Sequence, residues 1–125
     1  MTSPSRQRLL VVEDQKEIRK VLAKQLEGAG YSVVTSESGT AALELLASEN
    51  FDLVISDIVM PGPIQGPELA KRLCEKIPDQ RIIFLSGYAD QLFQDEYSSV
   101  SEFPRLAKPI FRSELLEAVT KALEK

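Results

Sequence analysis

The sequence from residue 53 to residue 61 reads LVISDIVMP, and this stretch decides the fold class. Its first three residues are apolar, as in a short strand that is covered on both faces. Asp57 follows this strand closely, and a loop with two prolines and two glycines occupies residues 60–66. In open parallel sheets the chemistry lies beyond the carboxyl ends of the strands, so the position of Asp57 directs attention to the other strand ends.

Similar segments recur along the chain. Short β-rich runs predict strands at 9–12, 31–34, 53–55 and 82–85, and a weaker fifth strand at 105–108 stops at Pro109. Between them, apolar residues at helical spacing predict helices at 18–26, 41–46, 69–77 and 115–123. Residues 88–99 show a weak, serine-rich pattern and predict a short or mobile fourth helix. This alternation predicts a doubly wound α/β domain with a parallel sheet and helices on both faces.

Composition excludes several classes of function. The 125 residues suffice for one domain, with a loose tail at 1–7 and a folded domain at 8–125. A net charge of −4 argues against nucleic-acid binding, and no apolar run approaches the roughly 20 residues of a membrane span. The absence of histidine excludes Ser-His-Asp catalysis and histidine-ligated zinc. The single cysteine, Cys74, fits a reducing compartment, and we expect a cytoplasmic protein.

Polar residues with complementary chemistry follow the predicted strands. The pair Glu13-Asp14 follows the first strand, Asp57 the third and Ser86 the fourth, and Lys108 ends the fifth. Crowded carboxylates repel one another by about 1 kcal/mol per pair in water, and by about 4 kcal/mol at an effective dielectric constant of 20. Oxygen ligands without histidine or cysteine favour a hard cation, and Mg²⁺ suits a site with few carboxylates best. Lys108 and Ser86 could then hold a phosphoryl group on Asp57.

Four of these residues also have a simpler interpretation. Asp14 and Glu17 have the spacing of a capping box at a helix start, a role that can coexist with metal binding. Asp57 could be an aspartate whose hydrogen bonds are satisfied within a turn, and Ser86 beside a glycine could serve turn geometry alone. Lys108, taken alone, could be a solvated lysine before a proline. The metal and phosphoryl interpretation gains its weight from the four positions together.

The whole chain resembles the receiver domain of two-component response regulators, including chemotaxis-type regulators. Four motifs carry this resemblance in the expected order and spacing: Glu13-Asp14, the stretch DIVMP at 57–61, LSG at 85–87 and Lys108-Pro109. The resemblance implies a flavodoxin-like (βα)5 fold with strand order 2-1-3-4-5. It also implies that the Lys108-Pro109 bond is cis.

The resemblance assigns roles to the residues of the motifs. Asp57 would be the phosphoacceptor, and Ser86 and Lys108 would contact the phosphoryl group. Mg²⁺ would be held by the carboxylates of Glu13, Asp14 and Asp57 and by the backbone carbonyl of Val59. The chain would act as a signalling switch, and not as an enzyme on other substrates, because it would catalyse only its own phosphorylation and dephosphorylation.

Arg105 departs from the usual family pattern, and two neighbours of the site, Val59 and Tyr88, bear on the rate of dephosphorylation. Arg105 stands three residues before Lys108, where the family often has a tyrosine or phenylalanine that swings inward on activation. A guanidinium cannot be buried there without a partner, so Phe103 is the candidate to replace the aromatic ring. Val59 and Tyr88 would flank the acyl phosphate, and neither offers an amide or carboxylate to position water. We therefore expect slow self-dephosphorylation.

The expected phosphoryl donor is a histidine kinase or histidine phosphotransfer protein, because this chain has no histidine. The expected output surface combines the fourth helix, the fifth strand and the fifth helix, and the chain would be a monomer or a phosphorylation-dependent dimer. The chain ends just after the last predicted helix, with no effector expected to follow. It is therefore either a stand-alone receiver or one module of a hybrid kinase or larger regulator.

Two other functions are alternatives to this one. A pseudo-receiver would dock or dimerise with partners without taking phosphate, and Arg105 is its best support. A flavodoxin-type FMN carrier shares the topology, but it needs a phosphate-binding loop after the first strand. Glu13 and Asp14 occupy that loop and would repel a flavin phosphate.

Overall fold

The computed structural model describes residues 6–87 and 103–124 of the chain. Along these residues strands and helices alternate in the following order: β1 (Arg8–Val12), α1 (Lys16–Gly28), β2 (Ser32–Ser36), α2 (Gly39–Leu46), β3 (Leu53–Asp57), α3 (Gly66–Lys76), β4 (Ile82–Ser86), β5 (Arg105–Ala107) and α5 (Arg112–Leu123). The segment 88–99, for which a short or mobile fourth helix is predicted, lies outside the described residues. Every other predicted strand and helix is present, with ends that differ by a few residues.

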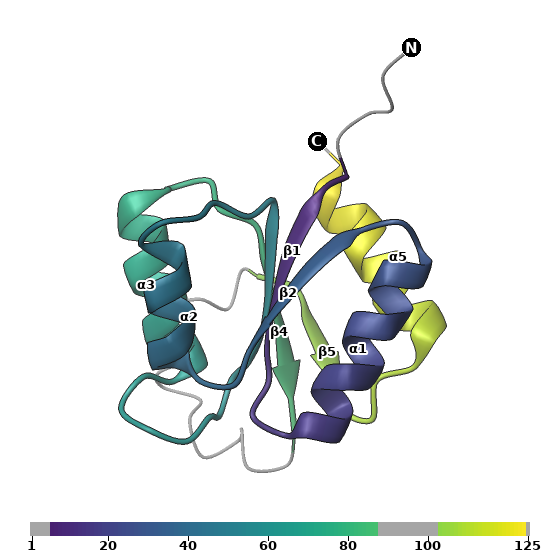
Figure 1. The fold of residues 1–125 in the computed structure, drawn as a ribbon, viewed down its shortest axis with the longest axis horizontal. Helices are drawn as coiled ribbons and strands as arrows, with labels where there is room; N and C mark the ends of the chain where they lie inside the picture. Colours follow the sequence, from purple (N-terminus) through teal and green to yellow (C-terminus); the bar gives the residue numbers. More distant parts are fainter. Residues whose placement is uncertain (1–5, 88–102, 125) are drawn as a thin grey trace.

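The five strands form one parallel sheet in the order β2-β1-β3-β4-β5, which confirms the predicted topology. All five therefore present their carboxyl ends at one edge of the sheet, at the end opposite the start of β1 (Figure 1). The register places Asp57 opposite Leu85, and Ser86 opposite Ala107. The last residues of β3, β4 and β5 thus lie side by side at that edge.

Alternate strand residues enter two separate cores, one on each face of the sheet. On one face, Leu10, Val54 and Phe84 pack beneath α2 and α3. On the other, Leu9, Ile55 and Ile83 pack beneath α1 and α5. Figure 1 shows the same division, with α2 and α3 on one side of the sheet and α1 and α5 on the other. Because both faces are covered, the central strands carry continuous apolar runs, and these runs were the sequence signal for them.

Local residues set several helix ends. Pro67 lies in the first turn of α3, where a missing N–H costs no helical hydrogen bond, and the helix ends two residues before Pro78. After α1, Gly30 adopts a φ of +103°, a conformation that side chains other than hydrogen rarely permit. In the part of the chain that the structure describes, no helix has the length and apolar character needed to span a bilayer.

Candidate functional site

Lys108 joins two carboxylates at the carboxyl edge of the sheet. Its Nζ lies 2.9 Å from Oε1 of Glu13, which directly follows β1, and 2.9 Å from Oδ1 of Asp57, the last residue of β3. The side chains of Glu13 and Asp57 are 0% and 2% exposed, and that of Lys108 is 26% exposed. The interpretation of Lys108 as a merely solvated lysine is therefore wrong, because its ammonium group lies between two buried carboxylates from different strands.

A third carboxylate completes an acidic cluster. One oxygen each from Glu13, Asp14 and Asp57 lie within 4.8 Å of one another, and Asp14 is exposed to solvent. Oδ2 of Asp57 is buried and has no hydrogen-bond partner among the described residues, so Asp57 is not an aspartate satisfied within a turn of this part of the chain. Oxygens on opposite sides of Mg²⁺ are about 4.2 Å apart, because each Mg–O bond is about 2.1 Å long. The spacing, the all-oxygen donor set and the unpartnered oxygen all fit a small hard cation.

The charges of the cluster shift its pKa values in different directions. Burial, together with the neighbouring Glu13 carboxyl, raises the pKa of Asp57 from 3.8 to about 8, although Lys108 opposes this shift. Burial also works against ionisation of Glu13, but the neighbouring Asp57 carboxyl, the hydrogen bond from the Gln15 N–H and the Lys108 ammonium outweigh it and lower the Glu13 pKa. The two carboxylates hold the pKa of Lys108 above its usual value despite burial. Without a cation, one ammonium does not fully compensate both carboxylates.

The loop after β1 differs from the expected capping box. Helix α1 begins at Lys16, with Gln15 as its N-cap, so Asp14 lies one residue too early to cap it and that prediction is wrong. Oε2 of Glu13 instead accepts a hydrogen bond from the Gln15 N–H at 2.9 Å. Nη1 of Arg19 donates to the backbone carbonyl of Glu13 at 2.8 Å and to that of Asp14 at 3.4 Å. These bonds fix the backbone of Glu13 and Asp14. None of them uses the Asp14 carboxylate, which can therefore serve as a ligand in the acidic cluster.

Residues 9–120 match the family profile of the response regulator receiver domain. The chain belongs to this receiver family. It is 37% identical over 116 residues to the response regulator receiver protein CpdR of Brucella abortus, covering 93% of this chain and 96% of CpdR. It is 36% identical over 119 residues to the sensor kinase CckA of the same organism, covering 94% of this chain but only 12% of CckA. Among solved structures, the chemotaxis response regulator CheY4 of Vibrio cholerae superimposes with a TM-score of 0.84 at 28% identity, over 95% of this chain and all of CheY4.

Two further predicted site residues of the receiver domain lie at the same edge of the sheet. Ser86 is the half-buried last residue of β4, and its carbonyl accepts a hydrogen bond from the Lys108 N–H at 2.8 Å. Val59 is half-buried and stands two residues after Asp57. The Lys108-Pro109 bond is cis, as the resemblance implies. The roles of Ser86 and of the Val59 carbonyl stay predictions.

The described tuning residues, Phe103 and Arg105, lie at the amino end of β5, away from the carboxyl edge. Arg105 opens β5 opposite Phe84 and is exposed, in agreement with the expectation that a guanidinium is not buried there. Phe103 is half-buried, and its ring packs edge-on against Phe84, with centroids 6.0 Å apart and planes at 77°. The aromatic ring of this segment is therefore at residue 103, two residues before position 105, where the family often has a tyrosine or phenylalanine. Tyr88 lies outside the described residues.

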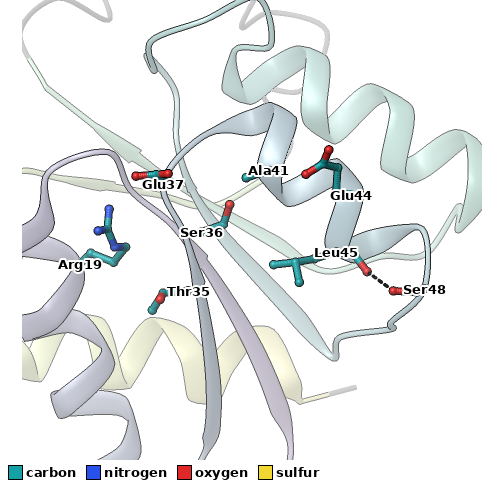
Figure 2. Close-up of a pocket in the computed structure, with 8 residues that line it drawn as sticks. All are labelled: Arg19, Thr35, Ser36, Glu37, Ala41, Glu44, Leu45 and Ser48. Atoms are coloured by element: carbon teal, nitrogen blue, oxygen red, sulfur yellow. Dashed lines mark hydrogen bonds between the residues drawn. The ribbon is translucent and has the colours of Figure 1, made fainter.

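A polar pocket borders the acidic loop, between α1 and α2 at the carboxyl end of β2 (Figure 2). Its lining residues are Arg19, Thr35, Ser36, Glu37, Ala41, Glu44, Leu45 and Ser48. Figure 2 shows Arg19 on one side of the pocket and Glu44 and Leu45 of α2 on the other. Because Arg19 also bonds the carbonyl of Glu13, the wall of this pocket is continuous with the loop that carries the acidic pair.

Three residues that support the site were not predicted from the sequence. Arg19 fixes the acidic loop, Gln65 bonds the loop after β3, and Gly66 packs directly on the backbone of Asp57. A Cβ at residue 66 would lie 2.3 Å from the carbonyl oxygen of Asp57. The pair QG at 65–66, just before Pro67, was a usable signal, since a polar residue and a glycine are frequent at the start of a helix.

Proposed function

We propose that this receiver domain accepts a phosphoryl group on Asp57 from a phosphohistidine of a histidine kinase or a histidine phosphotransfer protein. One observation carries the proposal: Asp57 is a buried carboxylate with one oxygen 2.9 Å from Lys108 Nζ, and its other oxygen has no hydrogen-bond partner in the described part of the chain. Membership in the receiver family supports it. The likeness to a sensor kinase and to a response regulator supports a partner of the histidine kinase type.

The proposed transfer exchanges one phosphorus bond for another. A carboxylate oxygen of Asp57 forms the new P–O bond while the P–N bond to the donor imidazole breaks, and the imidazole keeps the electron pair and takes up a proton. Lys108 would stabilise the charge on the phosphoryl oxygens, and the Ser86 hydroxyl would donate a hydrogen bond to one of them. The domain would thus catalyse only its own phosphorylation and dephosphorylation.

Mg²⁺ is the proposed cofactor. Glu13, Asp14 and Asp57 would hold it together with the carbonyl of Val59, and the ion would supply the positive charge that a phosphoryl group needs beside three carboxylates. The raised pKa of Asp57 also calls for a bound cation, because Asp57 must be ionised at neutral pH to act as the nucleophile. A cation that lowers this pKa would activate Asp57 without any change of fold.

The donor would dock on an apolar hollow beside the site. Apolar residues of α1 and of the segment after β5 line it, and Lys108 forms part of its wall: Ile18, Val21, Leu22, Pro109 and Ile110. Val21 is 51% exposed, and Phe111, the next residue along, is 62% exposed. A donor histidine can reach Asp57 only if the donor covers the rim around it, and this hollow shares Lys108 with the site. We therefore assign it to the phosphodonor.

The conformational change caused by phosphorylation would reach the output surface through the segment that contains Phe103 and Arg105. A phosphoryl group adds negative charge next to Ser86, and a shift of this residue would be transmitted to the strand paired with β4. The proposed output surface comprises β5, α5 and the fourth helix predicted from the sequence, which falls outside the described residues, and it would bind an output protein or a second copy after phosphorylation. Phe103 would take the part of the switching aromatic residue, because it already packs on the ring of Phe84.

Intact mass measured after incubation with acetyl phosphate tests the proposal. We expect the wild type to gain one phosphoryl group with Mg²⁺ and none with EDTA. The Asp57→Asn variant should gain none under either condition, whereas Asp79→Asn, at an exposed position remote in sequence, should behave as the wild type. If a small donor fails, a phosphorylated kinase domain should replace it.

A pseudo-receiver that only docks partners is the second candidate. The exposed Arg105, in place of an aromatic residue, is the observation that favours it. Failure of both acetyl phosphate and a phosphorylated kinase to modify Asp57 would establish this function. Arg105 would then be the first residue to substitute in a binding assay.

A further inference from the structure

The loop from β3 to α3 is organised by the side chain of Gln65. Its Oε1 accepts a hydrogen bond from the Met60 N–H at 2.8 Å. Its Nε2 donates to the Met60 carbonyl at 2.6 Å and to the Gly62 carbonyl at 3.2 Å. The carboxamide therefore binds both backbone groups of Met60, much as a neighbouring strand would, although Gln65 belongs to the loop itself.

This pairing also fixes the preceding carbonyl group. The Met60 N–H and the Val59 C=O belong to one planar peptide unit, and among the described residues only Lys108-Pro109 is cis. In a trans unit the two groups point in opposite directions, so the bond from Met60 to Gln65 sets the direction of the Val59 carbonyl. Rotation of this unit would break the 2.8 Å bond.

The other side of Val59 is fixed as well. The Ile58 N–H donates to the Leu85 carbonyl at 3.0 Å, and the Ile58 carbonyl accepts from the Gly66 N–H at 2.9 Å. Val59 thus stands between two residues that are each bonded through both backbone groups. Of these four bonds, two depend on a side chain, and that side chain is Gln65 in both.

We propose that Gln65 is a positioning residue for the metal site, because it holds the Val59 carbonyl in the direction needed for a fourth oxygen ligand. The inference rests on the proposed Mg²⁺ site, to which Val59 contributes its backbone. Removing a residue that holds a metal ligand in its orientation typically weakens metal binding by about 10- to 100-fold. Gln65 has this relation to Val59 without belonging to the acidic cluster.

The test compares Mg²⁺ binding by the full chain and by two variants that lose an amide. Gln65→Met keeps the length of the side chain and removes its three hydrogen bonds. Gln80→Met is the matched control, because the Gln80 amide bonds the carbonyls of Phe51 and Arg81 at the opposite ends of the strands. We expect Gln65→Met to bind Mg²⁺ about 10-fold more weakly by titration calorimetry, and Gln80→Met to bind within twofold of the wild type.

Two NMR measurements separate positioning from general loss of stability. In the wild type, Mg²⁺ should shift the carbonyl carbon resonance of Val59 and slow hydrogen exchange of the Met60 amide. The Val59 shift should be much smaller in Gln65→Met at the same Mg²⁺ saturation. The exchange measurement needs no variant, so it decides the question even if Gln65→Met fails to fold.

The outcomes distinguish this inference from the proposed function. Wild-type affinity in a folded Gln65→Met, or Met60 exchange that does not respond to Mg²⁺, would overturn the positioning role alone. Absence of Mg²⁺ binding by the wild type, with Asp14→Asn giving the same titration, would overturn the metal site itself and the inference with it. Weak binding by Gln65→Met together with a lost Val59 shift supports both.

Discussion

The Lys108 ammonium lies 2.9 Å from Oδ1 of Asp57, and the same nitrogen lies 2.9 Å from Oε1 of Glu13. One positive charge is therefore shared by two buried negative charges, and a buried charge without full compensation is costly. The protein can relieve this excess by binding a proton or by binding a cation. Both routes lead to measurable consequences.

The first consequence is a loss of stability as the pH rises in the absence of metal. The folded-state pKa of Asp57 is raised from 3.8 to about 8, so the folded form binds this proton more tightly than the unfolded form. The resulting stabilisation is complete below pH 4 and is lost as the pH approaches 8. We expect the free energy of unfolding in EDTA to fall by about 2–5 kcal/mol over this range.

Urea unfolding of the wild type and of Asp57→Asn, at several pH values between 5 and 8, checks this expectation. Above pH 5 the lowered pKa of Glu13 contributes no slope, because this carboxyl is then ionised in both states. The variant should show a flatter profile and exceed the wild type in stability at pH 8. Equal slopes for the two proteins would show that Asp57 is ionised throughout, and saturating Mg²⁺ should flatten the wild-type profile too.

The second prediction concerns the close contact between α3 and the end of β3. In Gly66→Ala, the new Cβ would lie 2.3 Å from the Asp57 carbonyl oxygen and 2.9 Å from Cα of Ile58, and both are backbone atoms. We expect a loss of about 2–4 kcal/mol in urea unfolding, since the backbone must move to admit the methyl group.

Gly28→Ala is the control for the glycine substitution. Gly28 ends α1, and apart from its chain neighbours and its own helix backbone no atom of the described residues lies within 4 Å of a Cβ placed there. Alanine is the better helix former, so this variant should be unchanged or more stable by up to about 1 kcal/mol. A Gly66→Ala variant as stable as Gly28→Ala would show that the contact on Asp57 can relax freely.

The third prediction separates donor docking from chemistry. Val21→Asp places a charge in the apolar hollow next to Lys108, where a partner surface would have to desolvate it. We expect phosphoryl transfer from a phosphorylated kinase or phosphotransfer protein to slow at least 10-fold, a cost of about 1.4 kcal/mol. Phosphorylation by acetyl phosphate should keep the wild-type rate, because a small donor needs no protein surface.

Ala47→Asp is the matched control for Val21→Asp. It adds the same charge at an exposed residue directly after α2, a helix on the other face of the sheet. Its rate with either donor should equal that of the wild type. Equal slowing by both variants would mean that added negative charge, and not the apolar hollow, governs transfer.

The sequence predicted the elements with strong local signals. The apolar runs of β1, β3 and β4 can be recognised in the sequence because these strands are covered on both faces. Because the strands are parallel, the polar residues at their carboxyl ends are expected at one edge of the sheet. The acidic cluster was predictable for the same reason, since the topology alone brings Glu13 and Asp57 to one edge. The order of the strands came from the family resemblance.

The start of α1 and the hydrogen bonds of Gln65 were not predicted correctly, because they depend on contacts that no local sequence pattern encodes. Asp14 and Glu17 have the spacing of a capping box, but the chain continues for one more residue before α1 begins. The reason is the nonlocal pairing of Glu13 with Lys108, which fixes the loop, while Oε2 of Glu13 takes the N–H of Gln15. The hydrogen bonds of Gln65 depend in the same way on how the loop folds back on itself. Such contacts need the three-dimensional arrangement.

The last prediction concerns how long the proposed phosphoryl group survives. Val59 is half-buried two residues after Asp57, and its side chain offers no group that could orient water towards an acyl phosphate. We expect a half-life of minutes or longer for the purified wild type with Mg²⁺, measured as decay of the phosphorylated mass. Val59→Asn supplies an amide at this position and keeps the backbone carbonyl proposed for the metal, so it should shorten the half-life about 10-fold. Val59→Leu, which has no polar group, should match the wild type. Decay of the wild type within seconds would show that another group already positions the water, and the neighbourhood of Tyr88 would be the place to search.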